Sequence, residues 1–289
     1  MGTAIKDSRA KSFAAVFIIY LLVSAVGVTV FHFLPFGVFV SLLIADIIAT
    51  AFTFIFSLIF KNASVYDPYW SVQPIVIVSL FAAVKGLDLS GVFPLIAISV
   101  WGVRLTANWA YTFKGLKYED WRYVLLKEKT GKLYPVINFT GIHMIPTLVV
   151  FLCVIPAVAV IILKPQFNAL SVVFFAISIL AVLLQGVSDL EMHAYRKDRK
   201  EPFMRKGLWK YSRHPNYLGE ILFWWGIGLF AVVLMPDKWY LLSGALSNTL
   251  LFLCVSIPMA DGRQAKKEGF EQYKKETFAL LPVKKAIRK

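Results

Sequence analysis

The block FAAVFIIYLLVSAVGVTVFHFL, residues 13–34, decides the fold because it is long, apolar and free of Asp, Glu, Lys and Arg. A helix needs about 20 apolar residues to cross the hydrocarbon core of a bilayer. Further apolar blocks follow at about 38–60, 66–84, 92–113, 140–163, 169–190, 216–235 and 239–258. Of the 289 residues 58% are hydrophobic and 17% are charged, whereas soluble proteins have roughly 25% charged residues. The sequence therefore predicts an all-α fold, a polytopic membrane helix bundle of about eight transmembrane helices.

The third block sets the range of this count to seven to nine. It is short and contains Pro68 and Pro74, features that a re-entrant segment shares with a full span. If this block did not cross the membrane, the loop 114–139 with its six Lys and Arg residues would lie on the side of the membrane opposite the cytoplasm. We therefore expect the block to be a full span.

The distribution of Lys and Arg predicts the orientation. With eight spans and the N-terminus inside, 27 of the 31 basic residues fall in inner segments and Arg104 falls in a span. The outer loops hold only Lys85, Lys164 and Lys238. Lys and Arg are retained on the cytoplasmic side of membrane proteins, so both termini are expected to be cytoplasmic.

Composition also excludes several classes of protein. The net charge of +14 does not indicate a nucleic-acid partner, because the basic residues lie in short loops beside spans, where topology and contact with membrane lipid explain them. Cys153 and Cys254 lie in apolar blocks, which argues against a disulfide framework or a metal site. The first block is expected to be an uncleaved helix, since no small-residue cleavage pattern stands out. No repeat or linker divides residues 1–289, which we expect to form a single membrane domain.

Polar residues inside the predicted spans are the first functional candidates, because a polar group in hydrocarbon is costly. They are Asp46, Gln73, Arg104, Asn108, Gln185, Asp189 and Glu220. For Asp46 and Arg104, an ion pair between helices is the structural alternative to a functional role.

The sixth block continues beyond the hydrocarbon as SDLEMHAYRKDRKEP, residues 188–202. Asp189, His193 and Arg196 are separated by four and three residues, so a helix would place them on one face. An exposed, charged helix end is the ordinary alternative. A functional role is favoured because the next loop adds further cations to the same cytoplasmic rim: Arg205, Lys206, Lys210, Arg213 and His214.

The stretch YSRHPNYLGE, residues 211–220, predicts the start of the seventh helix. Pro215 disfavours helix at His214 and suits a first helical turn, so the free N–H groups of this helix would face the basic loop. Such a helix start favours an anion, for example a phosphate. Asn216 and Glu220 lie one turn apart and would form one deeper wall that suits a carboxamide or ribose hydroxyls. A buried Glu220 costs several kcal/mol unless a partner binds it.

No glycine-rich phosphate loop follows a predicted strand, so a Rossmann domain is excluded as a nucleotide site. The glycines of GIG, residues 226–228, fall within a span and are interpreted as packing residues. Any nucleotide must therefore be held by the membrane helices and their cytoplasmic loops.

Three segments together resemble the steroid 5α-reductase superfamily, in particular its DUF1295-type bacterial branch. They are SDLEMHAYRKD, GLWKYSRHPNYLGEILFWWG and FEQYKKETFALLP. The resemblance is strongest over residues 180–282, is weaker across DPYWSVQP and WGVRL, and owes little to the first 60 residues. It implies a multi-spanning enzyme that binds NADPH from the cytoplasmic side and reduces a C=C bond conjugated to a carbonyl in a lipophilic, steroid- or lipid-like substrate. It also implies that residues 180–282 form a nucleotide-binding half within the domain.

The resemblance assigns roles to particular residues. Asp189 and Arg196 match nucleotide-binding positions, and Asn216 and Glu220 match the nicotinamide-side pair. Matches at Arg104 and Gln73 are weaker. The expected cofactor-binding set is Asp189, His193, Arg196, Arg205, Arg213, His214, Asn216, Tyr217, Glu220 and Arg104, and the expected catalytic set is Glu220, Gln73 and Asp67.

The sequence departs from the steroid reductases at the expected proton donor. A Glu after the Gln and a Tyr three residues before the Arg are replaced here by Pro74 and Trp101, which argues against a 3-oxo-steroid substrate. Electrophilic help at the carbonyl and a proton are still needed. Asp67, Tyr66, Tyr69 and Tyr111 are the candidates, with an interfacial aromatic belt as the alternative for the tyrosines.

NADPH is expected to bind more tightly than NADH, because the rim holds more cations than a pyrophosphate requires. The rim residues are Arg196, Arg199, Arg205, Lys206, Arg213 and His214. The main rival is an S-adenosylmethionine-dependent methyltransferase of the isoprenylcysteine carboxyl methyltransferase type, which shares the RHP-x-Y-x-G motif. Such enzymes follow the last span with an Arg and two adjacent Glu, whereas this chain has Arg263 and a single Glu268. A non-enzymatic lipid-binding protein is the third class. The expected location is the inner membrane of a bacterium or the endoplasmic reticulum of a eukaryote.

Overall fold

The computed structural model describes residues 5–283, in which all regular secondary structure is helical apart from one isolated parallel bridge between Ser212 and Phe278. Eight helical segments are long and apolar enough to cross a membrane. The predicted all-α, polytopic fold and its eight spans are thus confirmed. An even number of spans also places Arg9, at the start of the first, and Gln264, at the end of the last, on the same side.

The first four spans are simple helices that follow the predicted blocks closely. They are α2 (Arg9–Phe33), α3 (Val38–Ile59), α4 (Tyr69–Lys85), which is preceded by the 3-10 turn η1 (Ala63–Tyr66), and α5 (Leu89–Thr112). The third block is a full span, as the charge distribution predicted. Pro74 lies inside α4 without ending it.

The fifth span differs from the prediction in its length. The segment expected to be a loop, 114–139, contains α6 (Trp121–Thr130), η2 (Gly131–Leu133) and α7 (Tyr134–Ile137). A π-helical segment, η3 (Asn138–Met144), joins α7 to α8 (Ile145–Leu163). Charged and apolar residues alternate in this region, so hydropathy alone placed the helix start too late.

The last three spans carry most of the predicted site. They are α9 (Ser171–Lys197), α10 (Pro215–Leu234), and a composite of α11 (Ser243–Leu251), the π-helical η6 (Phe252–Ser256) and α12 (Ile257–Gln264). Short 3-10 segments η4 (Gly207–Lys210) and η5 (Pro236–Leu242) and the final helix α13 (Phe270–Glu276) connect and follow them. Helix α9 continues past the apolar block and α10 begins at Pro215, both as predicted.

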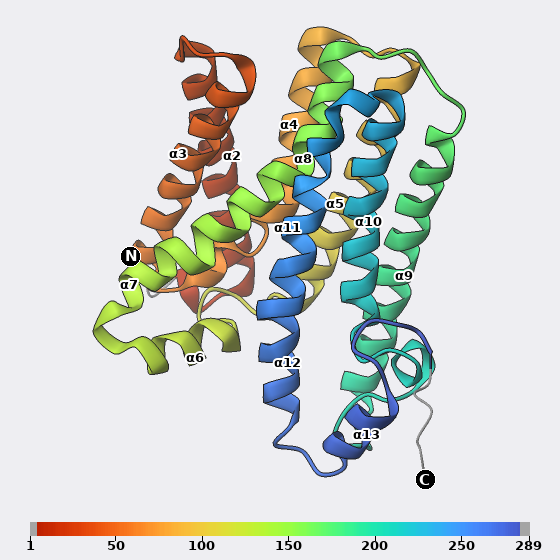
Figure 1. Cartoon of the computed structure of the whole chain (residues 1–289). Helices are drawn as coiled ribbons and strands as arrows, with labels where there is room; N and C mark the ends of the chain where they lie inside the picture. The colour runs from red at the N-terminus through yellow and green to blue at the C-terminus, as the bar shows by residue number, and fades with distance from the viewer. Residues whose placement is uncertain (1–4, 284–289) are drawn as a thin grey trace.

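The main bundle packs around aromatic and β-branched residues of α5, α8 and α10. Trp101, Val154, Val158, Phe223 and Trp224 are almost completely buried there. Helices α2 and α3 form a separate pair with its own core, set to one side of the bundle. Figure 1 also shows that α12 projects beyond the bundle toward α13. The cytoplasmic ends of α5, α9, α10 and α12 therefore surround the region where the site was predicted.

Candidate functional site

Helices α9 and α10 lie unusually close, and glycines make this possible. A Cβ atom added at Gly219 would lie 2.8 Å from the carbonyl oxygen of Ala181, and one at Gly226 would lie 2.9 Å from that of Phe174. Small residues permit such close backbone approach between membrane helices. The packing role predicted for Gly226 is confirmed, and the close contact fixes the polar residues at the cytoplasmic ends of both helices.

An outer cavity of about 640 Å³ lies between the ends of these helices, α5, α6 and α12. The predicted site residues that line it are Asp67, Asp189, His193, Arg196, Arg213, His214, Asn216 and Tyr217. Helical spacing therefore predicted correctly that Asp189, His193 and Arg196 share one face. His193 Nε2 donates a hydrogen bond of 2.7 Å to Oδ1 of Asn108 on α5, which fixes the imidazole in the wall.

An inner chamber of about 380 Å³ adjoins the outer cavity at a greater depth. The two share Asp67, Asp189, Asn216 and Tyr217 as lining residues, so they are adjacent compartments. The inner chamber is also lined by Arg104, Gln185 and Glu220, and its remaining wall is mainly apolar. A polar compartment thus adjoins an apolar one.

The Glu220 carboxylate is held by two indole groups. Trp101 Nε1 donates to Oε2 over 2.9 Å, and Trp224 Nε1 donates to Oε1 over 2.8 Å. Glu220 is 6% exposed. The protein itself therefore supplies two of the hydrogen-bond donors that a buried carboxylate requires. One of them is Trp101, which stands where the steroid reductases have a tyrosine.

Arg104 pairs with Asp189 and not with Asp46. Its Nη1 lies 2.7 Å from Oδ2 of Asp189, and its Nη2 donates to Oε1 of Gln185. These contacts link α5 to α9 at the boundary of the two compartments. An ion pair between Asp46 and Arg104, the structural alternative named above, is not formed, because the two side chains face different regions of the bundle.

Gln73 does not line either compartment, which corrects its placement in the catalytic set. Its Nε2 donates a hydrogen bond of 2.9 Å to Oδ2 of Asp46, and Tyr69 donates one of 2.7 Å to Oδ1. This cluster lies in the groove among α2, α3 and α4. The resemblance gave Gln73 a position along the chain, but the helix turns its side chain toward α3.

Asp67 does lie at the junction of the two compartments. Its Oδ1 accepts a hydrogen bond of 2.6 Å from the hydroxyl of Tyr123 on α6. Tyr123 also lines the inner chamber, so this pair presents a carboxylate and a phenol to the same space. Tyr123 was missed because it lies in a segment predicted to be a loop.

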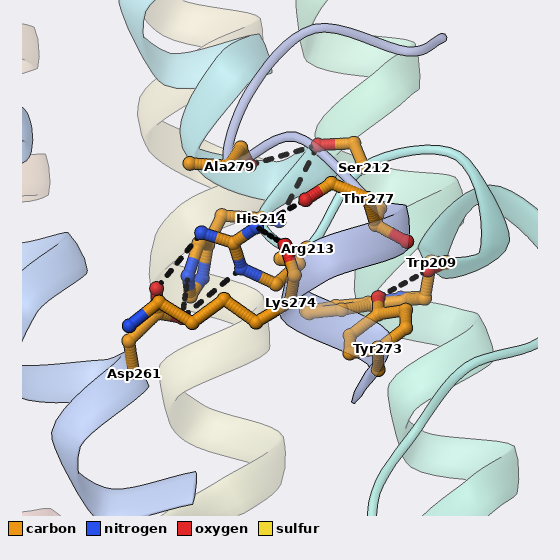
Figure 2. Close-up of polar contacts among 9 residues, drawn as sticks. All are labelled: Trp209, Ser212, Arg213, His214, Asp261, Tyr273, Lys274, Thr277 and Ala279. Atoms are coloured by element: carbon orange, nitrogen blue, oxygen red, sulfur yellow. Dashed lines mark hydrogen bonds and ion pairs between the residues drawn. The ribbon is translucent and has the colours of Figure 1, made fainter. Parts of the chain in front are cut away.

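Figure 2 shows that Arg213 and His214 are directed toward Asp261, a residue that the sequence reasoning did not include. Arg213 Nη2 and His214 Nε2 lie 2.9 Å from the two oxygens of that carboxylate. Arg213 Nη1 donates to the carbonyl oxygens of Lys274 and Thr277. Both residues line the outer cavity as predicted, but these cations already have protein acceptors.

The same cluster fastens the segment after α12 to the start of α10. The backbone N–H groups of Arg213 and His214 donate to the carbonyls of Phe278 and Ala279, each over 3.0 Å. Tyr273 donates to the carbonyl of Trp209. Burial raises the pKa of the Tyr273 hydroxyl, so it remains a neutral donor. The segment that includes α13 thereby forms part of the cavity wall.

The rim cations differ in their availability. Arg205 forms an ion pair with Glu201 and does not line the outer cavity, which corrects its expected place in the cofactor set. Within residues 5–283, Arg196 has no ion pair. Arg263 lies over the ring of Trp121 at 4.3 Å from the ring centroid. Partial burial and the nearby Arg199 and Arg263 lower the pKa of Lys267, so this part of the rim is strongly positive.

Several buried polar atoms around the compartments have no hydrogen-bond partner within the described part of the chain. Four of them belong to residues that line the inner chamber, Asn216 Oδ1, Gln185 Nε2, Asn248 Nδ2 and Arg104 Nε, and Gln264 Oε1 belongs to a residue that lines the outer cavity. Buried polar groups are normally satisfied, so a cluster of unpaired ones indicates a place for a bound molecule or water. Asn248, from α11, was not predicted, although it is a polar residue inside a predicted span, the same signal that singled out Asn108 and Gln185.

No group of three or more His, Cys, Asp and Glu side chains in residues 5–283 is arranged to hold a metal ion. The polar side chains that line the two compartments are amides, carboxylates, hydroxyls and cations, types that bind organic ligands and phosphates.

The sequence model of a family described as "Protein of unknown function (DUF1295)" matches residues 53–277. The chain belongs to the DUF1295 family. The match begins after most of the first two spans and includes both compartments of the site. The predicted membership in DUF1295 is confirmed, and the assignment to a bacterial branch stays a prediction.

One curated relative of this DUF1295 protein is an uncharacterized protein of Schizosaccharomyces pombe (strain 972 / ATCC 24843). The two are 25% identical over 203 residues, which cover 60% of this chain and 58% of the relative. The chain thus spans less than two thirds of the length of that relative. No solved structure matches the chain.

Proposed function

We propose that this DUF1295 protein is an NADPH-dependent membrane reductase. Its substrate would be a lipophilic molecule with a C=C bond conjugated to a carbonyl. The observation that carries the proposal is the set of unpaired polar atoms where the polar outer cavity meets the apolar inner chamber. The resemblance of residues 180–282 to the steroid 5α-reductase superfamily adds the reaction type.

The unpaired atoms fit the carboxamide of a nicotinamide ring. Asn216 offers an acceptor and Gln185 a donor, both without partners within residues 5–283. A carboxamide has one carbonyl acceptor and an NH₂ group with two donors, which complements them. The volumes of both compartments fall within the roughly 300–1,000 Å³ of small-molecule sites.

The outer cavity fits the phosphates of the same cofactor. Arg196 and Arg263 line it and have no ion pair within the described residues. Arginine binds phosphate through bidentate, charge-assisted hydrogen bonds. When bound, NADPH would supply a hydride to the carbon at the far end of the conjugated double bond.

The protein's own residues would supply the remaining steps of the reduction. Asn248 lines the inner chamber and its amide Nδ2 has no partner within residues 5–283, so it would donate a hydrogen bond to a substrate carbonyl oxygen and stabilise the developing enolate. Tyr123 carries a proton on a hydroxyl that is hydrogen-bonded to Asp67 and lines the same chamber. Transfer of that proton to the carbon next to the carbonyl would complete the addition of one hydride and one proton.

Glu220 would act mainly by position, because each of its oxygens already accepts one indole hydrogen bond. Its remaining lone pairs would accept from the carboxamide NH₂ of a nicotinamide bound beside Asn216, which lies four residues earlier on α10. The predicted nicotinamide-side pair is retained in the proposal in this form. Gln73 and Arg205 are not part of it.

Ligand titration tests the proposal. Purified protein in lipid nanodiscs should bind NADPH saturably, as measured by nucleotide fluorescence or thermal shift. Asn216→Ala should weaken this binding by roughly 3- to 10-fold, the loss expected for one or two neutral hydrogen bonds. Asn168→Ala is the matched control, because that exposed asparagine lies in the loop between α8 and α9. Saturable binding of S-adenosylmethionine without NADPH binding would instead favour the methyltransferase.

A further inference from the structure

Helices α8 and α11 touch backbone to backbone at one point. A Cβ atom added at Gly244 on α11 would overlap the carbonyl group of Leu152 and the amide nitrogen of Cys153 on α8. Such an approach is possible only for glycine. This contact holds the two helices together in the half of the bundle away from the outer cavity.

Toward the cytoplasmic side the two helical segments, α7–α8 and α11–α12, diverge. Figure 1 shows α8 running toward α7 on one side, while α12 continues from α11 on the other. Each helical segment contains a π-helical turn near the point where the two separate. This is η3 between α7 and α8, and η6 between α11 and α12. Single π-helical turns are rare and often occur at functional sites.

We call the space between these two helical segments the α8/α12 wedge. We define it by the inner-chamber residues on its two walls. One wall consists of Gly141, Ile142, Pro146 and Val149, and the other consists of Leu251, Phe252, Val255, Ser256 and Met259. None of these nine side chains is charged, and Ser256 is the one polar side chain among them. The wedge is therefore mainly apolar on both sides.

The wedge reaches the outer surface of the bundle. Val255 lines the inner chamber and is nevertheless 46% exposed, and Gly141 on the opposite wall is also exposed. Both lie in segments apolar enough to cross a membrane, so we expect membrane lipid beside them. The inner chamber is thus accessible from the side, at the depth of the cytoplasmic leaflet that the charge distribution predicts.

We propose that the α8/α12 wedge admits a hydrocarbon chain of a membrane lipid from the bilayer into the inner chamber. The hydrocarbon chain would lie between the two π-helical segments. The polar end of the same lipid would lie at Asn248 and Glu220, and the remainder of the lipid would stay in the bilayer. A hydrocarbon chain that contacts these apolar side chains does not require any charged group to leave water. Its entry therefore carries no cost for burying a charge. That this lipid is the substrate rests on the proposed function, whereas entry of the chain does not.

Photo-crosslinking tests the proposal directly. The protein is reconstituted in nanodiscs of phosphatidylcholine that carries a diazirine on one acyl chain, irradiated, digested and mapped by mass spectrometry. We expect adducts on the buried wedge residue Phe252 and the buried chamber residue Val150, in addition to adducts on outward-facing residues such as Leu180. Adducts confined to outward-facing residues would overturn the proposal.

Two substitutions on one π-helical segment provide the matched comparison. Val255→Trp should block the wedge and reduce chamber adducts, normalised to those at Leu180, by about tenfold, which corresponds to ~1.4 kcal/mol against entry. Leu253→Trp should leave them unchanged, because Leu253 is equally exposed, at 46%, and does not line the chamber. Equal effects of the two substitutions would contradict the wedge as the route.

A variant on the other wall covers the case in which Val255→Trp fails to fold. The nearest atom to a Cβ at Gly141 is Cγ2 of Ile137, at an ordinary 3.8 Å, so Gly141→Leu should be accommodated and should also reduce chamber adducts. Nucleotide titration separates this inference from the proposed function. NADPH binding without chamber adducts would refute the wedge alone, and chamber adducts without NADPH binding would support the wedge and refute the reductase.

Discussion

Nε1 of Trp101 on α5 donates a 2.9 Å hydrogen bond to Oε2 of Glu220 on α10, 119 residues further along the chain. Trp224 holds the other oxygen of the same carboxylate. The bond therefore joins two spans and also fixes the acidic side chain at the end of the inner chamber. This relationship has a direct consequence for stability.

Trp101→Phe should lower the free energy of unfolding by about 1–3 kcal/mol, because it leaves a buried carboxylate oxygen with one donor fewer. Thermal unfolding of detergent-solubilised protein measures the effect. Trp239→Phe is the control, since Trp239 is 70% exposed. An unchanged melting temperature for Trp101→Phe would show that this hydrogen bond contributes nothing to stability.

Arg104→Ala should destabilise the protein by roughly 2 kcal/mol, because Asp189 then loses its partner in a largely buried setting. Asp189→Asn should have a smaller effect, because the amide oxygen of Asn can still accept a hydrogen bond from Arg104. The double variant Arg104→Ala, Asp189→Ala should be less destabilised than the sum of the two alanine variants. Strict additivity in this thermodynamic cycle would argue against coupling between the two residues.

Arg196→Ala should weaken NADPH binding by about tenfold, as expected for the loss of one charge-assisted hydrogen bond to phosphate, at 1.5–3 kcal/mol with partial solvent screening. Binding titrations with NADPH and NADH show whether the loss falls on the extra phosphate or on both nucleotides. Arg205→Ala should have little effect, because that guanidinium pairs with Glu201 outside the cavity. The reverse order of effects would return Arg205 to the cofactor site.

Arg213→Ala should release the segment that follows α12, because it removes the donors to Asp261, Lys274 and Thr277. Limited proteolysis should cut residues 265–283 faster in this variant than in the parent. Lys210→Ala is the control from the same loop. Equal cleavage rates would mean that backbone hydrogen bonds to Phe278 and Ala279 suffice to hold the segment.

The orientation is open to cysteine labelling in sealed cells or vesicles, in a background without Cys153 and Cys254. Lys238→Cys should react at once with a membrane-impermeant maleimide from outside, because Lys238 lies in a predicted outer loop. Lys129→Cys on α6 should react only after the membrane is opened. Rapid outside labelling at Lys129 would reverse the inferred orientation.

The sequence predicted those features that depend on local pattern. Long apolar blocks gave the spans, Pro215 marked the start of α10, and the spacing of Asp189, His193 and Arg196 placed them on one face. Each follows from geometry within a single helix. These features are also the ones that the structure reproduces most closely.

The features that were missed depend on contacts between distant segments. Nothing near Glu220 in the sequence indicates Trp101, and nothing near Arg213 indicates Asp261, so the cations of the rim were counted without their carboxylate partners. Gln73 was assigned by resemblance, which fixes a position along a helix but not the neighbour that the side chain faces. Tyr123 carries no pattern that distinguishes it from other tyrosines, whereas Asn248 lies inside a predicted span and carries the same signal as Asn108 and Gln185.

The attachment of α13 to the start of α10 also bears on the order in which the site is built during synthesis. Phe270 and Tyr273 line the outer cavity, yet they leave the ribosome after all eight spans have been translated. A nascent chain that has already inserted its helices therefore still lacks this part of the wall. Nucleotide-sized ligands would meet a finished compartment only after residues 270–279 have folded back, so membrane integration and site completion are separate stages of biogenesis.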